Sequence, residues 1–169
     1  MEGLDDDAVD EAKQAMGVAD RVMPAWEQVV SDMEATAEEY RDSGWTAIEC
    51  HPGDVAMLTE GDRTGLDVLL PDDEFDELQA SYEADDSFDE VEVFRATQAG
   101  ILFAVAALKN ETTETTLLVP LYYDTDRAQE FIEMVHDEGE LRLHLRPLDE
   151  RQVVTFTQHD PAPFLPGES

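Results

Sequence analysis

Residues 100–124, GILFAVAALKNETTETTLLVPLYYD, decide the fold expected for this chain. They contain two runs rich in Val, Leu, Phe and Tyr, residues 101–108 and 116–123, which are separated by a polar segment with Asn110. Runs of about eight residues have the length of strands, and a polar break between them is typical of a turn. Pro120 cannot donate a hydrogen bond to a neighbouring strand, so we expect an edge or a bulge there. The segment predicts a central β-hairpin, buried on at least one face.

Strands and short helices on both sides of this hairpin complete an α+β pattern. The order strand, helix, strand, strand occurs twice, over residues 66–108 and 116–158, and acidic residues favour the start of each helix. Short connections favour antiparallel neighbours. We therefore expect one antiparallel sheet built from two β-α-β-β units, with the helices on one face. The other strands are expected at 45–50, 55–59, 66–70, 91–98, 141–148 and 152–158, and the helices at 73–84 and 126–137.

A long amphipathic helix is expected before the first strand. Apolar residues recur from Ala12 to Tyr40 with alternating spacings of four and three, as in a coiled coil, but further apolar residues widen the stripe. We predict a helix over residues 7–42, kinked or broken at Pro24, which lacks the N–H that a helix interior requires. The stripe can pack on the chain's own sheet or form a homodimer contact. The candidate interface residues are Met16, Met23, Trp26, Val30, Met33 and Tyr40.

The length of 169 residues suits one domain with a helical extension. We divide the chain into an N-terminal helical segment (1–44), an α+β domain (45–160) and a Pro-rich tail (161–169). The tail contains three prolines and is expected to be irregular and disordered, although Phe164 and its neighbour Leu165 can dock on a partner or on the sheet.

Acidic residues dominate the charge and are spread along the whole chain. There are 42 Asp and Glu residues against 10 Lys and Arg, a formal charge of −32. Such repulsion destabilises a compact domain in dilute buffer, but it is screened in molar salt, where the Debye length is about 3 Å. The composition therefore resembles that of proteins from halophiles that accumulate salt. An acidic partner of a basic protein, or a nucleic-acid mimic, is the alternative. The charge disfavours nucleic acid as a partner.

A cytoplasmic location is expected. The single cysteine, Cys50, cannot form an internal disulfide, so nothing points to an oxidising compartment. The acidic start argues against a signal peptide. No apolar stretch reaches the roughly 18–20 residues that span a bilayer, so we expect a soluble protein that does not bind membranes.

Residues 37–54, AEEYRDSGWTAIECHPGD, resemble a set of uncharacterised haloarchaeal proteins. The shared pattern is a helix that ends in EEYR, a Gly-Trp pair, a strand and an HPGD turn. The resemblance implies a halophilic origin and no known activity.

No catalytic or cofactor-binding motif occurs: the nucleophile elbow, the P-loop, the dinucleotide fingerprint, C-x-x-C and H-E-x-x-H are all missing. Cys50 and His51 adjoin, but neighbours in a strand point to opposite faces, so we interpret them as a core and a turn residue. His51 with Asp54 across the turn is the remaining candidate for catalysis or a metal. The pairs Asp72-Asp73 and Asp124-x-Asp126 stand where helix caps belong. We expect no cofactor and no metal.

The strongest candidate site is the run 141–146, LRLHLR. Its alternation places three leucines on one face of a strand and two arginines and a histidine on the other. Such a row can hold a carboxylate or phosphate through charge-assisted hydrogen bonds. The alternative is pairing with the chain's own acids on neighbouring strands. The candidate ligand-binding residues are Arg142, His144 and Arg146, with Arg151 in the next turn and Arg95 on a strand that can lie nearby.

These features favour a non-enzymatic binding or protein-interaction module, acting as a homodimer or with another protein. The alternative is a small-anion-binding sensor or enzyme that uses the Arg142/His144/Arg146 face. A regulator of a basic protein is a third hypothesis.

Overall fold

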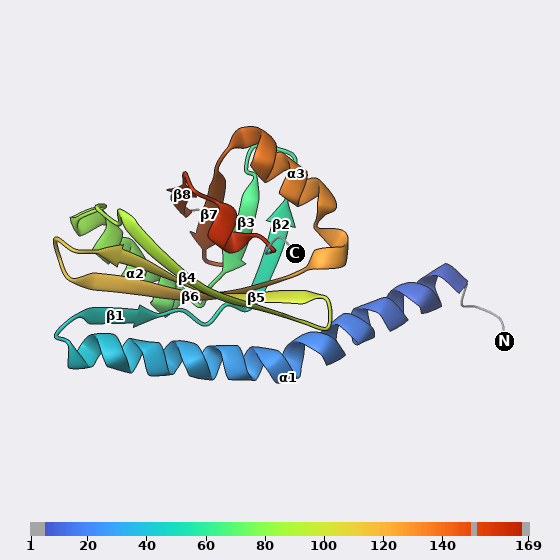
Figure 1. Ribbon diagram of the computed structural model, residues 1–169, viewed down its shortest axis with the longest axis horizontal. Coiled ribbons are helices and arrows are strands. Elements are labelled where there is room, and N and C mark those ends of the chain that lie inside the picture. Colours follow the sequence, from blue (N-terminus) through green and yellow to red (C-terminus); the bar gives the residue numbers. More distant parts are fainter. Residues whose placement is uncertain (1–5, 150–151, 167–169) are drawn as a thin grey trace.

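The computed structural model describes the backbone of residues 6–149 and 152–166, and the side chains of residues 22–149 and 152–166. Within these ranges the fold is α+β, with three α-helices and two mixed four-stranded sheets (Figure 1). Sheet A has the strand order β1-β6-β5-β4, and sheet B has the order β2-β3-β7-β8. The helices are α1 (Asp6–Asp42), α2 (Asp72–Ala84) and α3 (Gln129–Glu138). The strands are β1 (Thr46–Glu49), β2 (Asp54–Leu58), β3 (Gly65–Leu69), β4 (Glu90–Gln98), β5 (Ile101–Asn110), β6 (Thr115–Asp124), β7 (Leu141–Arg146) and β8 (Val154–Gln158).

The central hairpin predicted from the sequence is confirmed. Strands β5 and β6 pair antiparallel without a bulge, from Ile101 opposite Asp124 to the turn at Asn110. On its other side β6 pairs with β1, and that pairing ends at Leu118. Pro120 therefore lies where β6 has passed the end of one neighbour, an edge position at which a strand tolerates proline.

Strand β5 is buried on both faces, which explains its continuous apolar run. One set of alternate side chains points into the main core, shared with sheet B, α2 and α3: Leu102, Ala104, Ala106 and Leu108. The other set packs under α1: Ile101, Phe103, Val105 and Ala107. Strand β5 is therefore the centre of the protein, with the other sheet on one side and the long helix on the other.

The expected single antiparallel sheet is wrong, because the two β-α-β-β units divide their strands between two sheets. The first unit is β3-α2-β4-β5, and the second is β6-α3-β7-β8. The first strand of each unit pairs with the hairpin of the other unit: β3 lies beside β7 in sheet B, and β6 lies beside β5 in sheet A. Each sheet also contains one parallel pair, β1 with β6 and β3 with β7. A single sheet with every helix on one face would expose one apolar face of β5, whereas two sheets that share a core bury it.

The N-terminal helix packs on sheet A, as one of the two alternatives for its stripe predicted. Its observed bounds agree with the predicted 7–42, Pro24 lies inside it, and its ribbon bends in the middle (Figure 1). Met33 is fully buried against β5 and β6, and the Trp26 ring meets the Tyr122 ring edge-on with centroids 5.1 Å apart. No helix in the described ranges is both long enough and apolar enough to cross a membrane.

The expectation of a disordered tail is wrong for the part that the structure describes. Phe164 and Leu165 are buried in the main core. Arg95 of β4 donates hydrogen bonds to the carbonyls of Ala162 and Leu165, both at 2.6 Å, and the Tyr123 hydroxyl donates to the carbonyl of Phe164 at 2.8 Å. Apolar burial and satisfied backbone carbonyls together hold this short segment in place.

Candidate functional site

The alternation in β7 places its side chains as predicted. The three leucines of the strand lie in the main core, and Arg142, His144 and Arg146 lie on the other face. Arg142 contacts two carboxylates of its own chain, at 2.8 Å from Glu138 and 2.6 Å from Glu140. An anion at this end of the row would have to compete with both acids.

The other two members of the row are also engaged within the chain. Arg146 Nε donates to Asp67 of β3 at 2.8 Å, and Asp67 is only 5% exposed. His144, 3% exposed, lies 2.9 Å from the Thr155 hydroxyl and 2.7 Å from the Thr64 carbonyl. Because burial disfavours the charged imidazole, the pKa of His144 is lowered below its ordinary value.

Arg95 does not extend this row. Arg95 projects from β4 and binds the carbonyls of the C-terminal segment, as noted above. Arg151 lies outside the described residues. Among the described residues, the arginine–histidine row consists of Arg142, His144 and Arg146, and each of them contacts other groups of the same chain.

A groove between α1 and β4 offers more room for a ligand. It encloses about 590 Å³. It forms because α1 packs over β1, β6 and β5, while β4 is the last strand of sheet A. Paired residues on neighbouring strands point to the same side of a sheet. Phe94 of β4 pairs with Val105, which faces α1, so Phe94 also faces the groove, and it is 50% exposed.

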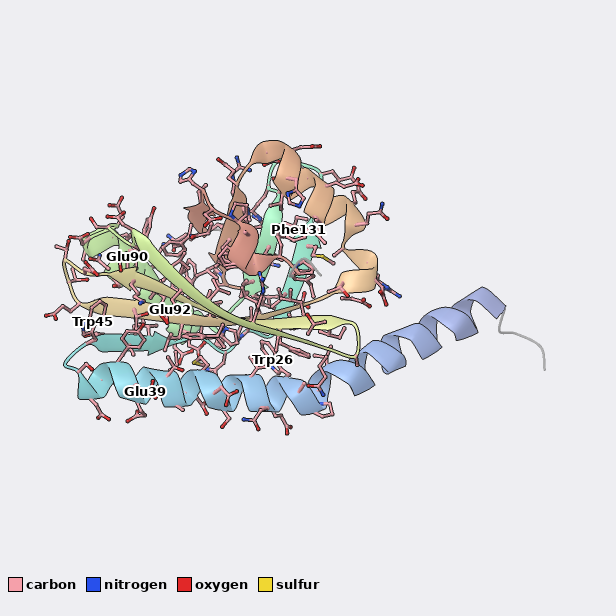
Figure 2. The ribbon with its side chains drawn as sticks, viewed as in Figure 1. Trp26, Glu39, Trp45, Glu90, Glu92 and Phe131 are labelled. Carbon is pink, nitrogen blue, oxygen red and sulfur yellow. The ribbon has the colours of Figure 1, made fainter. Side chains whose placement is uncertain are left out.

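The groove has an apolar floor and an acidic rim. The floor comprises Phe94, Ala96, Phe103 and Val105, and α1 adds Val29, Thr36 and Tyr40 on one side. Asp32 and Glu39 of α1 and Glu92 of β4 are exposed along the border, and Figure 2 labels Glu39 and Glu92 on these two elements. The sequence analysis did not predict this groove. The signal for it is Phe94, an aromatic residue that alternates in phase with Glu90 and Glu92 on the same side of the strand.

Arg95 of β4 is among the residues that line the groove, and a second cation, Lys109 of β5, contacts two of the lining residues. Lys109 Nζ lies 3.3 Å from Glu92 and 5.7 Å from the centroid of the Tyr40 ring. Burial lowers the pKa of Lys109, but the contacts with Tyr40 and Glu92 outweigh it, so the pKa is raised and the side chain is charged. Lys109 thereby ties the helix to the sheet beside the apolar floor.

The predicted interface residues of the N-terminal helix do not share one free surface. Met33 is buried, and Trp26, Val30 and Tyr40 pack against sheet A or the loop after α1. Met23 is 54% exposed. Met16 lies in the part of α1 whose side chains are outside the description.

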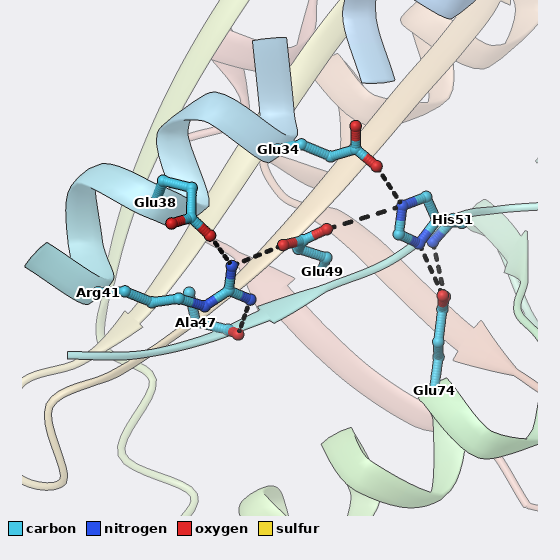
Figure 3. Close-up of polar contacts among 7 residues, drawn as sticks. All are labelled: Glu34, Glu38, Arg41, Ala47, Glu49, His51 and Glu74. Carbon is cyan, nitrogen blue, oxygen red and sulfur yellow. Dashed lines mark hydrogen bonds and ion pairs between the residues drawn. The ribbon is translucent and has the colours of Figure 1, made fainter. Parts of the chain in front are cut away.

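Cys50 and His51 face different surroundings. Cys50 is fully buried in the main core, and burial, reinforced by Glu74 and Glu77, raises the pKa of its thiol, so it is unreactive. His51 reaches the surface where α1, β1 and α2 meet (Figure 3). The carboxylates around its ring come from Glu34, Glu49 and Glu74, whereas the sequence had suggested Asp54.

Both ring nitrogens of His51 face carboxylates. Nδ1 lies 2.7 Å from Glu74, and Nε2 lies 3.1 Å from Glu34 and 3.8 Å from Glu49. Burial lowers the pKa of His51, but the hydrogen bonds to Glu74 and Glu34 outweigh it, so its pKa is raised. Among the described residues, Glu34, Glu49 and His51 are the group placed to hold a metal ion.

The acidic pairs predicted as helix caps lie at helix starts. Asp124 accepts a hydrogen bond from the backbone N–H of Asp126 at 2.9 Å, where a short 3-10 turn (Thr125–Arg127) begins. Asp72 and Asp73 lie in the first turn of α2, where negative charge favours the helix dipole.

Comparison with known proteins gives a family and no activity. Residues 12–166 match a family of unknown function, DUF7529. No curated protein and no solved structure matches the chain. The match extends from within α1 to the buried C-terminal segment, so it includes both sheets, the groove and the surroundings of His51. The chain belongs to DUF7529.

Proposed function

We propose that this protein is an interaction module that binds an apolar side chain of a protein partner in the groove between α1 and β4. The half-exposed Phe94 ring beside Phe103 and Val105 is the observation that carries the proposal. A hollow of about 590 Å³ lies within the range of about 300–1,000 Å³ typical of ligand sites. Exposed apolar patches rimmed by polar residues mark interaction surfaces.

The rim of the groove indicates the charge of the partner. Asp32, Glu39 and Glu92 favour a segment with basic residues on either side of the apolar anchor. A second copy of this chain, with 42 acidic residues against 10 basic ones, would instead place mostly acids in near contact with this rim. We therefore expect a heterologous partner.

The acidic composition also bears on the conditions of binding. We infer from the charge of −32 that the protein works in concentrated salt. There the Debye length falls to about 3 Å, so the rim acts only on charges in near contact. Burial of the apolar anchor then supplies most of the affinity, at about 25 cal/mol per Å² of apolar surface before the entropic costs of association.

The test fills the groove and leaves the rest of the surface unchanged. Ala96→Trp places an indole over the floor, and Ala80→Trp makes the same change on the exposed surface of α2. The neutral dye Nile red should bind the wild type and Ala80→Trp in about 2–3 M KCl, and bind Ala96→Trp much more weakly. Equal dye binding by all three proteins would contradict an open groove.

A comparative pull-down from the native cell at the same salt then identifies the occupant. Proteins retained by the wild type and by Ala80→Trp but lost with Ala96→Trp are the expected partners. If instead the wild type sediments as a dimer and Ala96→Trp as a monomer, the occupant is a second copy, and the heterologous partner is wrong. If the retained proteins do not change with Ala96→Trp, the groove is not the interaction surface.

A further inference from the structure

His51 lies at the junction of three elements, and each of them contributes a carboxylate to its surroundings (Figure 3). Glu34 comes from α1, Glu49 from β1 and Glu74 from α2. The junction therefore brings an imidazole nitrogen next to carboxylate oxygens, and both ligand types bind divalent transition metals.

We propose that Glu34, Glu49 and His51 bind a divalent transition-metal ion of the Zn²⁺ type. One ligand atom from each lies within 4.8 Å of the others. His51 Nε2 is 3.1 Å from Glu34 Oε2 and 3.8 Å from Glu49 Oε1. Tetrahedral ligands about 2.0–2.2 Å from a common Zn²⁺ lie roughly 3.3–3.6 Å from one another. The Glu34 and Glu49 oxygens, which lie within 4.8 Å of each other, must therefore move up to about 1 Å closer, and rotation of the exposed Glu34 side chain permits this.

Two further contacts fix the orientation of the ligands. Glu74 Oε2 accepts from Nδ1–H of His51 at 2.7 Å, which leaves Nε2 directed toward Glu34 and Glu49. This is the carboxylate–histidine arrangement found in metal sites, where the second carboxylate sets the tautomer. Arg41 holds the other oxygen of Glu49, Oε2, at 2.7 Å, so Glu49 presents Oε1 to the imidazole.

The metal takes the place of a proton. Carboxylates at both ring nitrogens favour the doubly protonated, cationic imidazole when no metal is bound. Binding forms a bond from the lone pair of Nε2 to the metal and releases the Nε2 proton to solvent, while the Nδ1 proton stays on the imidazole and is donated to Glu74 in a hydrogen bond. Glu34 and His51 are partly exposed, so solvent completes the coordination. Imidazole favours Zn²⁺ over Mg²⁺, which prefers oxygen ligands alone.

The site would clamp the helix to the sheet. Glu34 directly follows the buried Met33, which anchors α1 on β5 and β6. A metal shared by Glu34, Glu49 and His51 links α1, β1 and the segment that leads to β2. Because a ligand that binds only the folded state stabilises it, Zn²⁺ should raise the thermal midpoint.

Calorimetric titration of Zn²⁺ into the chelator-treated full chain, in about 2 M KCl to suppress non-specific binding to surface acids, tests the proposal. The matched pair is Glu34→Gln and Glu27→Gln, both at exposed positions on α1, of which only Glu34 faces the imidazole. We expect one saturable site in the wild type and in Glu27→Gln. Glu34→Gln should bind at least about tenfold more weakly, and His51→Gln should lose the site. Mg²⁺ should not compete.

Spectroscopy provides a readout independent of affinity. Co²⁺ bound by the wild type and by Glu27→Gln should give a visible d–d absorption band that Glu34→Gln alters, since the coordination sphere changes. Equal Zn²⁺ affinity in Glu34→Gln and Glu27→Gln, or the lack of a saturable site in the wild type, would overturn the proposal. Because Glu34 is exposed, its variant should fold even if His51→Gln does not.

Discussion

Glu74 binds His51 at two places. Its Oε1 accepts the backbone N–H of His51, and its Oε2 accepts the Nδ1–H of the imidazole, both at 2.7 Å. The two bonds join α2 to the end of β1 across the turn that leads to β2. One carboxylate therefore holds both the backbone and the side chain of the residue on which three elements converge.

Glu74→Gln should destabilise the fold by about 1 kcal/mol, because an amide keeps one hydrogen bond but loses the charge opposite the imidazolium. Urea unfolding in about 2 M KCl measures the difference. Glu83→Gln, an exposed position on the same helix, is the control and should change the stability by less than about 0.5 kcal/mol. Equal effects of the two variants would contradict a structural role for the Glu74–His51 pair.

Met33→Ala should cost about 2–5 kcal/mol, since Met33 is fully buried between α1 and sheet A and its truncation leaves a cavity. Met23→Ala, on the exposed part of the same helix, should cost less than about 0.5 kcal/mol. Both values come from urea unfolding at high salt. A small effect of Met33→Ala would mean that α1 does not depend on this contact for docking.

The stability contributed by neutral His144 should decline in weak acid. Its folded-state pKa is lowered, chiefly by burial, with Arg63 and Arg142 adding to the effect and the Thr64 carbonyl and Asp67 opposing it. The unfolded chain therefore binds a proton at His144 first as pH falls below about 6.5, and protonation favours unfolding. Neutral His144 therefore contributes fully to the free energy of unfolding above about pH 6.5, and this contribution is lost as the pH falls toward the lowered pKa of the folded state.

Urea unfolding at about pH 7.5 and pH 5.5 measures this effect as the difference between the wild type and His144→Gln, since other groups titrate equally in both. The wild type should lose more stability than His144→Gln over this interval. His159→Gln, at a largely exposed histidine, should behave like the wild type. Identical pH dependence in the wild type and His144→Gln would refute the assignment.

Lowering the salt should unfold the protein. With a formal charge of −32 and a Debye length that grows to about 10 Å at 0.1 M salt, repulsion between surface acids acts over several neighbours. Circular dichroism during dialysis from about 2–3 M KCl to 0.1 M should show loss of helix and sheet. Full stability at 0.1 M would contradict the halophilic interpretation of the sequence.

Arg146→Ala should destabilise the protein by about 2–3 kcal/mol, because it removes a partner of the buried Asp67, although Arg63 still lies 3.2 Å from that carboxylate. Arg142→Ala, whose partners are more exposed, should cost less than about 1 kcal/mol. Phosphate and sulfate, which stabilise folded proteins in general, should shift the thermal midpoint of the wild type and of both variants equally. A phosphate-specific rise lost in Arg142→Ala would instead support the anion-binding hypothesis.

The sequence alone predicted the local elements. The apolar runs on either side of Asn110, the glycine after residue 43 and the acids at Asp72 and Asp73 correctly predicted the central hairpin, the end of α1 and the start of α2, whereas α3 begins at Gln129, after a 3-10 turn, and not at the predicted residue 126. These features depend on residues close in the chain, through turn chemistry, capping and hydrophobic periodicity. The alternation in β7 was read correctly for the same reason.

The candidate site was only partly visible in the sequence. Glu49 and His51 are two residues apart, so a strand that continues regularly to His51 places them on one side, but Pro52 argued against such a continuation. Glu34 and Glu74 join them only because α1 and α2 pack against the end of β1. The groove likewise depends on how far α1 extends across sheet A, which leaves Phe94 exposed.

What the sequence determined was that residues 100–124 form a hairpin whose first strand is apolar on both faces. What only the tertiary structure decided was which elements cover those faces: α1 on one, and on the other a second sheet that takes β3 from one unit and β7 and β8 from the other. Strand pairing between distant segments is chosen by the joint burial of complementary apolar faces, and no single segment carries that information.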